Sequence, residues 1–150
     1  MRLRAFGRGR CSEWGDDTLR FDRGRERRGG GAVFAGRSDL KVTGHWFFLN
    51  GPVKDGGGMY LYDCHRVEIT DCVFVLNLAK WGGAIYLERC SDVLIQGNIF
   101  VANLARRDGG AVSVSFSRRV TLSRNRTAFN AALRRDHRYD LHKCSNVMVE

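Results

Sequence analysis

Tyrosine and glutamate residues recur at one fixed spacing in the middle of the chain, and together they have the chemistry to hold a sugar ring. Tyr60 and Tyr62 are followed 26 residues later by Tyr86 and Glu88. An aromatic ring offers a flat apolar surface, and a carboxylate accepts hydrogen bonds from hydroxyl groups. We therefore take these four residues as the candidate ligand face. Tyrosine also favours strands through packing alone, so the pattern is also that of exposed strand tyrosines without a ligand, and this interpretation is favoured.

Histidine and cysteine residues lack the spacing of a metal site or a redox motif. The five cysteines form no C-x-x-C pair, which is the usual zinc-binding and thioredoxin-like spacing. His137 and His142 lie near acidic residues, but on one strand a separation of five residues points them to opposite faces. We therefore expect no metal site, no catalytic residues and no cofactor.

The charge of the chain is strongly positive, but its distribution argues against nucleic acid as the partner. The formal net charge is +9. Residues 1–28 hold nine Arg against five acidic residues, residues 106–138 hold nine Arg against two Asp, and the segment between them is almost neutral. Nucleic-acid binding usually interleaves basic residues with aromatic residues that stack on bases. The Arg pairs 106–107, 118–119 and 134–135 have no such aromatic neighbours among them.

An internal repeat of 26–27 residues organises the chain. Gly pairs begin at positions 29, 56, 82 and 109, and an asparagine column repeats the same spacings at positions 50, 77, 103 and 130. Apolar columns share this phase, and one of them runs Phe47, Phe74, Phe100, Thr127. Within each unit the apolar positions are two residues apart, which is the spacing of a strand and not of a helix.

Short strands of this kind bury their apolar faces when the chain coils. Each strand then lies beside its equivalent one coil later, roughly 4.8 Å away. The predicted fold is all-β: a right-handed parallel β-helix of about 4–5 coils with three short strands in each. In the third unit the strands are expected near residues 84–88, 93–96 and 98–102, with a loop at 104–108. Residues 29–150 form the β-helix, which we expect to be truncated at its C-terminal end, and residues 1–28 form an Arg/Gly-rich disordered arm.

Two turn columns and one cysteine column are predicted to be structural. Side chains of Asn50, Asn77, Asn103 and Asn130 should hydrogen-bond to one another along the solenoid axis, as amide ladders do in stacked sheets. The same interpretation applies to a second column, formed by His45, Cys72, Asn98 and Asn125. Cys64 and Cys90 share a column in adjacent coils, where a disulfide is feasible and packed free thiols are favoured.

Two tetrapeptides carry a resemblance to known β-helices. Gly82-Gly83-Ala84-Ile85 and Gly109-Gly110-Ala111-Val112 match GGA[ILV], and the segments 47–50, 74–77 and 100–103 match FxxN. The units resemble right-handed β-helix repeats of the pectate-lyase-like superfamily, and the alternating tetrapeptides resemble the repeats of chlamydial polymorphic membrane proteins. The second resemblance implies a surface-exposed autotransporter passenger associated with adhesion. Departures from the pattern occur at Gly58, Thr127 and Asp136-His137.

The coil geometry bears on whether the candidate face is catalytic. Its acids, Glu88 and Asp140, are two coils apart, roughly 10 Å along the axis, whereas glycoside hydrolysis needs two carboxyl groups at ~5–5.5 Å or ~6.5–9.5 Å. A lyase would need several acids around calcium and a nearby base. The nearest such group lies on one turn, where we expect Asp63 and Arg89 to form a surface ion pair across coils.

These observations favour a structural or adhesive surface β-helix that binds a polysaccharide or cell-surface ligand through its repetitive outer face, without catalysis. Two alternatives stay open: part of a polysaccharide-active enzyme (lyase, hydrolase or C5-epimerase), with calcium needed only by the lyase, and a polyanion-binding module that uses the Arg-rich ends. The expected location is extracellular or at the cell surface. The chain as given has no secretory signal and no apolar run long enough for a membrane helix. We also expect further coils or a cap as its structural partners.

Overall fold

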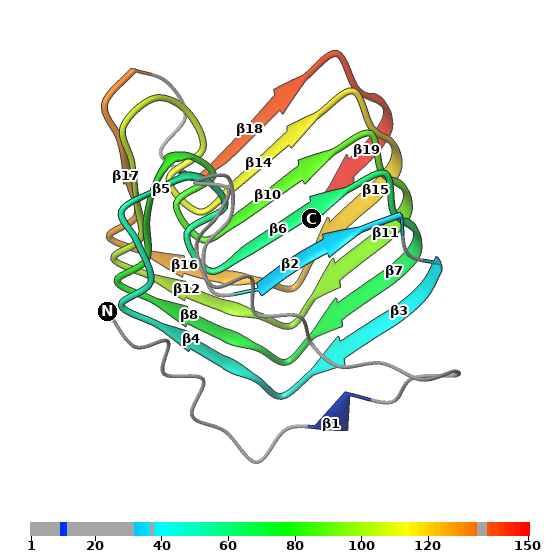
Figure 1. The fold of residues 1–150 in the computed structure, drawn as a ribbon, viewed down its shortest axis with the longest axis horizontal. Coiled ribbons are helices and arrows are strands. Elements are labelled where there is room, and N and C mark those ends of the chain that lie inside the picture. Colours follow the sequence, from blue (N-terminus) through cyan, green and yellow to red (C-terminus); the bar gives the residue numbers. More distant parts are fainter. Residues whose placement is uncertain (1–9, 12–31, 37, 135–137) are drawn as a thin grey trace.

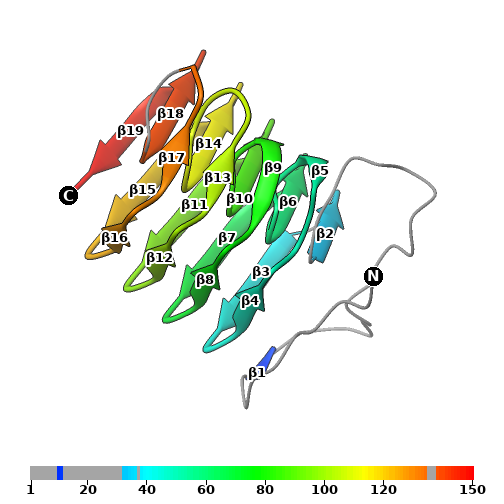
Figure 2. The same cartoon turned by 90° about the vertical axis from the view of Figure 1, so that its left-hand side faces the viewer.

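The chain folds into a parallel β-solenoid, in which each coil passes through four sheets in turn (Figure 1). The computed structural model describes residues 10–11, 32–36, 38–134 and 138–150, and these contain strands and turns only. Figure 2 shows the coils stacked one on another from the cyan to the red end of the chain. The predicted all-β solenoid is therefore confirmed.

Sheets 1 and 2 contain the first two strands of each coil and form the longer part of the wall. Sheet 1 consists of β2 (Ala32–Ala35), β6 (Met59–Tyr62), β10 (Ile85–Glu88), β14 (Val112–Ser115) and β18 (Tyr139–His142). Sheet 2 consists of β3 (Ser38–Thr43), β7 (His65–Thr70), β11 (Ser91–Gln96), β15 (Arg118–Ser123) and β19 (Ser145–Val149), with the short β1 (Arg10–Cys11) antiparallel to β3.

Sheets 3 and 4 complete the coil. Sheet 3 consists of β4 (Trp46–Phe48), β8 (Val73–Val75), β12 (Ile99–Val101) and β16 (Arg126–Ala128). Sheet 4 consists of β5 (Val53–Asp55), β9 (Leu78–Trp81), β13 (Leu104–Ala105) and β17 (Ala131–Ala132). Sheet 4 corrects the prediction of three strands per coil, because Leu104 and Ala105 pair with Leu78 and Ala79 of the preceding coil where a loop was expected.

The register of the sheets places like residues above one another, so the interior is a set of stacked columns. Phe74 stacks on Phe47 with ring centroids 4.7 Å apart and on Phe100 at 5.0 Å. Phe74 and Phe100 are completely buried. Offset stacking of this kind stabilises a core beyond the apolar area that it buries. The predicted Phe column therefore lies in the interior.

Residues with a left-handed backbone make the corners of the coil. After sheet 3 the corner residue is Leu49, Leu76, Ala102 or Phe129, with φ between +51° and +55°. Left-handed φ is unfavourable for residues other than glycine, so the surrounding structure must hold these corners in place. In each coil the next residue is an asparagine, and its amide makes the hydrogen bonds that do so.

The asparagine ladder runs along the corner between sheets 3 and 4. Asn50 Nδ2 donates to Asn77 Oδ1, Asn77 Nδ2 to Asn103 Oδ1 and Asn103 Nδ2 to Asn130 Oδ1, each at 2.9 Å. Each of these oxygens also accepts the backbone N–H of the asparagine one coil earlier. In the second turn column, Asn98 Nδ2 donates to Asn125 Oδ1 at 3.1 Å, and the backbone N–H of Cys72 donates to Asn98 Oδ1.

The Gly pairs allow the chain to enter sheet 1 at a close approach between coils. Gly82 has φ +56°, and a Cβ on Gly83 would collide with the carbonyl oxygen of Gly110 in the next coil. Glycine is the one residue that meets both requirements without strain. The predicted arm over residues 1–28 lies outside the described residues except for Arg10–Cys11, which pair with β3.

Candidate functional site

The predicted ligand face is built by the outward-facing positions of sheet 1. Parallel pairing places Tyr60, Tyr86, Ser113 and Asp140 in one column and Tyr62, Glu88, Ser115 and His142 in the next. These positions face outward because the alternate residues, such as Ile85 and Leu87, fill the interior. The structure therefore brings the four predicted residues together on two adjacent strands.

Contacts within this face bind the tyrosines to their neighbours. The Tyr60 and Tyr86 rings stack with centroids 5.6 Å apart and an interplanar angle of 9°. The Tyr60 hydroxyl donates to Glu88 Oε2 at 2.9 Å. Tyr60 is only 6% exposed, so it is not the exposed strand tyrosine that its sequence context suggested. Burial, with the Glu88 carboxylate beside it, raises the pKa of Tyr60 well above its usual range.

Tyr62 has a partner of its own outside the column. Arg89 Nη1 donates to the Tyr62 hydroxyl at 3.0 Å, and the guanidinium lies 5.8 Å from the centre of the Tyr62 ring. The prediction that Arg89 pairs with Asp63 is therefore wrong. Arg89 has φ +56° at its corner, and its side chain extends across the neighbouring tyrosine.

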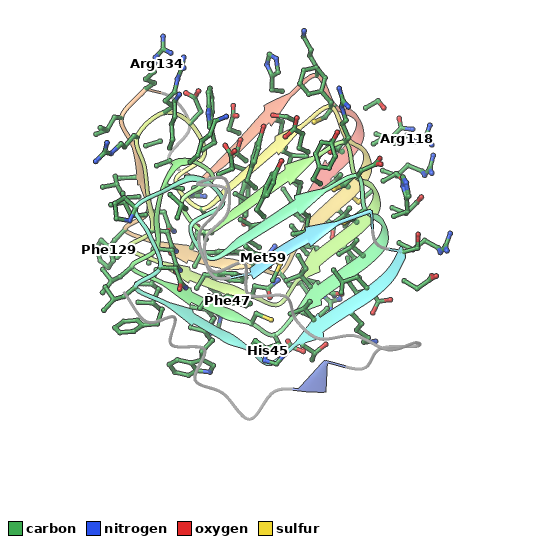
Figure 3. The ribbon with its side chains drawn as sticks, viewed as in Figure 1. His45, Phe47, Met59, Arg118, Phe129 and Arg134 are labelled. Atoms are coloured by element: carbon green, nitrogen blue, oxygen red, sulfur yellow. The ribbon has the colours of Figure 1, made fainter. Side chains whose placement is uncertain are left out.

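A cleft of about 420 Å³ opens over the last strands of sheet 1, beside the connections that run from sheet 4 back to sheet 1. Tyr86 is the one member of the predicted face that lines it. Other walls come from the connections between sheets, including Arg134, which Figure 3 shows at the upper left. The complete lining is Trp81, Tyr86, Asp108, Ser115, Phe116, Arg134, Asp140 and His142.

Three aromatic side chains give the cleft its apolar surface. The Trp81 ring lies under the guanidinium of Arg107, which is 4.5 Å from its centre. Phe116 meets the His142 ring edge-on at 5.8 Å. Burial raises the pKa of Tyr86, and a hydrogen bond with Ser115 acts in the opposite direction. Aromatic planes held by such contacts are ready-made platforms for a ring-shaped ligand.

Two carboxyl groups supply the polar chemistry of the cleft. Asp140 Oδ2 accepts a hydrogen bond from Ser113 Oγ at 3.0 Å. Asp108 Oδ1 is buried and has no hydrogen-bond partner, and Arg107 Nε is in the same condition. Buried polar atoms normally have partners, so these two unpaired atoms distinguish this connection from the rest of the described residues. The carboxylate pair considered from the sequence was Glu88 with Asp140, but the pair that lines this cleft is Asp108 with Asp140.

Residues of the types that can ligate a metal are dispersed over the described parts of the chain. Within residues 10–11, 32–36, 38–134 and 138–150, no three His, Cys, Asp or Glu side chains gather in a way that could hold a metal ion. His137 and Asp136 of the considered His/Asp segment lie outside the described residues. Cys64 and Cys90 are buried thiols that form no disulfide, and the hydrogen bond between them raises the pKa of Cys90.

Sheet 2 carries an ionic ladder on its outer face, in a column where all four residues have left-handed φ. Arg66 forms a bidentate pair with Asp39, and Arg119 forms one with Asp92; the Nη2–Oδ2 distances are 2.8 and 2.7 Å. Arg119 lowers the pKa of Asp92 to about 2. Exposed pairs add little stability. The pairing with Asp92 nevertheless occupies Arg119, one of the two residues of the Arg118–Arg119 pair considered for polyanion binding.

A family comparison agrees with this architecture. A family model described as "Right handed beta helix region" matches residues 18–138, which is most of the chain. The chain belongs to the right-handed β-helix family. This right-handed β-helix matches no curated protein and no solved structure.

The family assignment is to the β-helix region as such. It names neither the pectate-lyase-like superfamily nor the chlamydial passengers, so those resemblances stay predictions from the GGA[ILV] and FxxN repeats. In the part of this β-helix that the structure describes, no helix is long and apolar enough to cross a membrane. The cleft-lining residues that the sequence did not reveal are Trp81 at the end of β9, and Asp108, Phe116 and Arg134, which lie in turns and connections.

Proposed function

We propose that this β-helix binds a saccharide in the cleft over sheet 1 and holds it without turnover, as an adhesive or structural surface protein would. The observation that carries the proposal is the composition of the cleft: three aromatic side chains face a space that also contains two carboxylates, a serine, a histidine and an arginine. The cleft volume of about 420 Å³ lies within the usual range of small-ligand sites, ~300–1,000 Å³.

The chemistry of a sugar ring fits both kinds of surface. Its C–H face packs against an aromatic plane such as Tyr86, whose ring is already fixed by stacking on Tyr60. Its hydroxyl groups are donors for the carboxylates of Asp108 and Asp140 and acceptors for Arg134. A rigid site of this kind loses little conformational entropy when it binds. The proposal includes a location outside the cell or at its surface, which the resemblance to surface passengers supports.

The test is a binding titration of the full chain against a panel of neutral and acidic oligosaccharides by calorimetry. We expect Trp81→Ala and Asp108→Asn each to weaken binding by about 10-fold or more, since each removes one kind of contact. Tyr62→Ala is the matched control, because Tyr62 belongs to the predicted face but does not line the cleft. Absence of binding across the panel refutes the proposal, and loss of binding in Tyr62→Ala alone moves the site to the lower coils.

The polysaccharide-active enzyme is the second candidate, and the two carboxyl groups in one cleft favour it. Hydrolysis requires a pair of carboxyl groups on either side of the scissile bond, and Asp108 and Asp140 both line this space. In this case the wild-type chain converts an oligosaccharide to shorter products detected by mass spectrometry, while Asp108→Asn and Asp140→Asn keep binding and lose conversion. Unsaturated products that form only when calcium is present would indicate a lyase instead.

A further inference from the structure

Sheet 3 has an apolar outer face. Its strands point Phe47, Phe74 and Phe100 inward, so their other residues face outward. The two outward columns follow from the parallel register: one is Trp46, Val73, Ile99, Arg126, and the other is Phe48, Val75, Val101, Ala128. A strand that is apolar on both faces is typical of a sheet covered on both sides.

The corner beside these strands extends the same surface. Its residues are Leu49, Leu76, Ala102 and Phe129, and Figure 3 shows Phe129 projecting from the left side of the solenoid. Trp46 is 53% exposed, Leu76 is 45% exposed and Phe129 is 88% exposed. Segments 46–49, 73–76 and 99–102 contain no ionisable residue. We call the two outward columns and this corner the apolar face.

The area of the apolar face is large for a surface left in water. A fully exposed side chain of this size has a surface of ~150–250 Å². Multiplied by their exposed fractions, the surfaces of six residues add up to an exposed area of roughly 600 Å²; these are Trp46, Phe48, Leu49, Leu76, Ile99 and Phe129. The largest apolar patch of a typical monomer is ~300–600 Å². Two such faces together bury roughly 1,200 Å², which reaches the size of a stable protein–protein interface, ~1,200–2,000 Å².

When the face is paired with itself, large residues meet small ones at two positions, and the other facing pairs are apolar on both sides or join an aromatic ring to a cation. A two-fold axis along the strand direction places the first coil of one copy opposite the fourth coil of the other. Phe48 then faces Ala128, and Leu76 faces Ala102. Trp46, the largest aromatic residue of its column, faces Arg126, the only charged residue there, which is the pairing of a cation with an aromatic ring.

We propose that two copies of this chain pack their apolar faces together, with solenoid axes antiparallel. The interface is a sheet-on-sheet contact with the two sheets ~10 Å apart. Val75 and Val101 come from the two central coils and face each other across the two-fold axis. This inference is independent of the proposed saccharide binding, because the cleft lies on sheet 1 and the interface on sheet 3.

The first test measures the mass of the full chain by analytical ultracentrifugation at concentrations up to ~100 μM. We expect a dimer for the wild type, and a rise of about 100-fold in the dissociation constant for Val75→Glu, because that variant buries a charge in the interface. Thr121→Glu, at an outward position of sheet 2, is the matched control and should leave the dimer intact. Both variants should keep the strand-type circular dichroism spectrum of the wild type.

Charge complementation tests the antiparallel arrangement. Val75→Glu and Val101→Lys chains should each be monomeric alone, whereas their equimolar mixture should dimerise because Glu of one copy meets Lys of the other. Trp46→Ala and Arg126→Ala give a second test. Within one chain these residues are three coils apart, ~14 Å, where mutational effects normally add. A non-additive effect of about fivefold on dimerisation therefore reports a contact across the interface.

Three outcomes would overturn the proposal. The wild type is monomeric at all concentrations; Val75→Glu dimerises as the wild type does; or the wild-type monomer binds neutral phosphatidylcholine vesicles and Val75→Glu does not, in which case a lipid surface is the occupant.

Discussion

The asparagine ladder makes one quantitative prediction about what holds the coils in register. The Asn77 side chain is fully buried and takes part in four hydrogen bonds. Its Nδ2 donates to Asn103 Oδ1 and to the carbonyl of Phe47, and its Oδ1 accepts from the backbone and side-chain N–H groups of Asn50. Asn77→Ala thus leaves two donors of Asn50 without partners and removes one hydrogen bond each from the Phe47 carbonyl and Asn103 Oδ1.

The magnitude follows from the number of groups left unpaired. A buried polar group that loses its partner costs ~1–3 kcal/mol, so the two unpaired donors of Asn50 predict a loss of about 2–5 kcal/mol in the free energy of unfolding, allowing for partial relief by water in the space left by the side chain. Asn50→Ala is the matched control at the first rung. It removes one donor, while Asn77 Oδ1 keeps the backbone N–H of residue 50, so we expect a loss of only about 1 kcal/mol.

The assay is urea unfolding followed by circular dichroism, with the slope of the free energy against urea compared between variants. An unchanged slope shows that the same surface is exposed on unfolding. Asn77→Asp separates hydrogen bonding from volume, since it keeps the size and the acceptor oxygens but has no N–H to donate. We expect this variant to lose at least as much stability as Asn77→Ala. Equal losses for Asn50→Ala and Asn77→Ala, or a tolerated Asn77→Asp, would refute the ladder argument.

The other predictions concern the core and the ionic ladder. Phe74→Ala should lower the free energy of unfolding by about 3–5 kcal/mol, because the fully buried ring stacks on Phe47 and Phe100. Thr127→Ala in the same column is the control. Equal melting temperatures for Phe74→Ala and the wild type would contradict this prediction. Arg119→Gln should return the pKa of Asp92 from about 2 towards ~3.9, as measured by a carboxyl titration in NMR. Because the folded pKa is the lower one, the pair stabilises the fold above pH ~4, and this stabilisation is lost as the pH falls through about 2. An Asp92 pKa that is the same in Arg119→Gln and the wild type would show that Arg119 is not the cause.

The coils were predictable because parallel stacking of equivalent strands produces a repeated pattern of residue types in the sequence. When Phe100 lies directly over Phe74, and Asn103 over Asn77, the same side-chain environment recurs once per coil. Similar residues therefore occupy equivalent positions in successive coils, and aligning the repeat units of the sequence reveals them as a column. The fourth strand was missed because Leu104–Ala105 is two residues long and too short to show alternation, although Ala79, Ala105 and Ala132 recur at the repeat spacing.

The outer faces were harder to predict, because the repeat does not indicate whether an outward side chain is exposed or packed against a neighbour. The segment 46–49 is continuously apolar, yet the repeat identifies only Phe47 as an interior residue. Trp46 and Phe48 point outward, and only the structure shows that 53% and 39% of their surfaces are exposed. In the same way, Tyr60 and Glu88 looked free to meet a ligand, whereas the structure commits each to the other.

The cleft lies where the repeat changes length, and this is the signal that the sequence did contain. Gly82 comes five residues after Asn77, whereas Gly56 comes six residues after Asn50 and Gly109 six after Asn103. The second coil is therefore one residue shorter between its asparagine and its Gly pair, so Trp81 directly precedes Gly82 where Asp108 precedes Gly109. A change in length cannot be absorbed inside a strand without turning every later side chain to the opposite face. It therefore accumulates in the connection, which is the part of the coil free to shape a binding site. The single spacing of 26 residues between Gly pairs therefore marks the connection at Trp81 in the sequence itself.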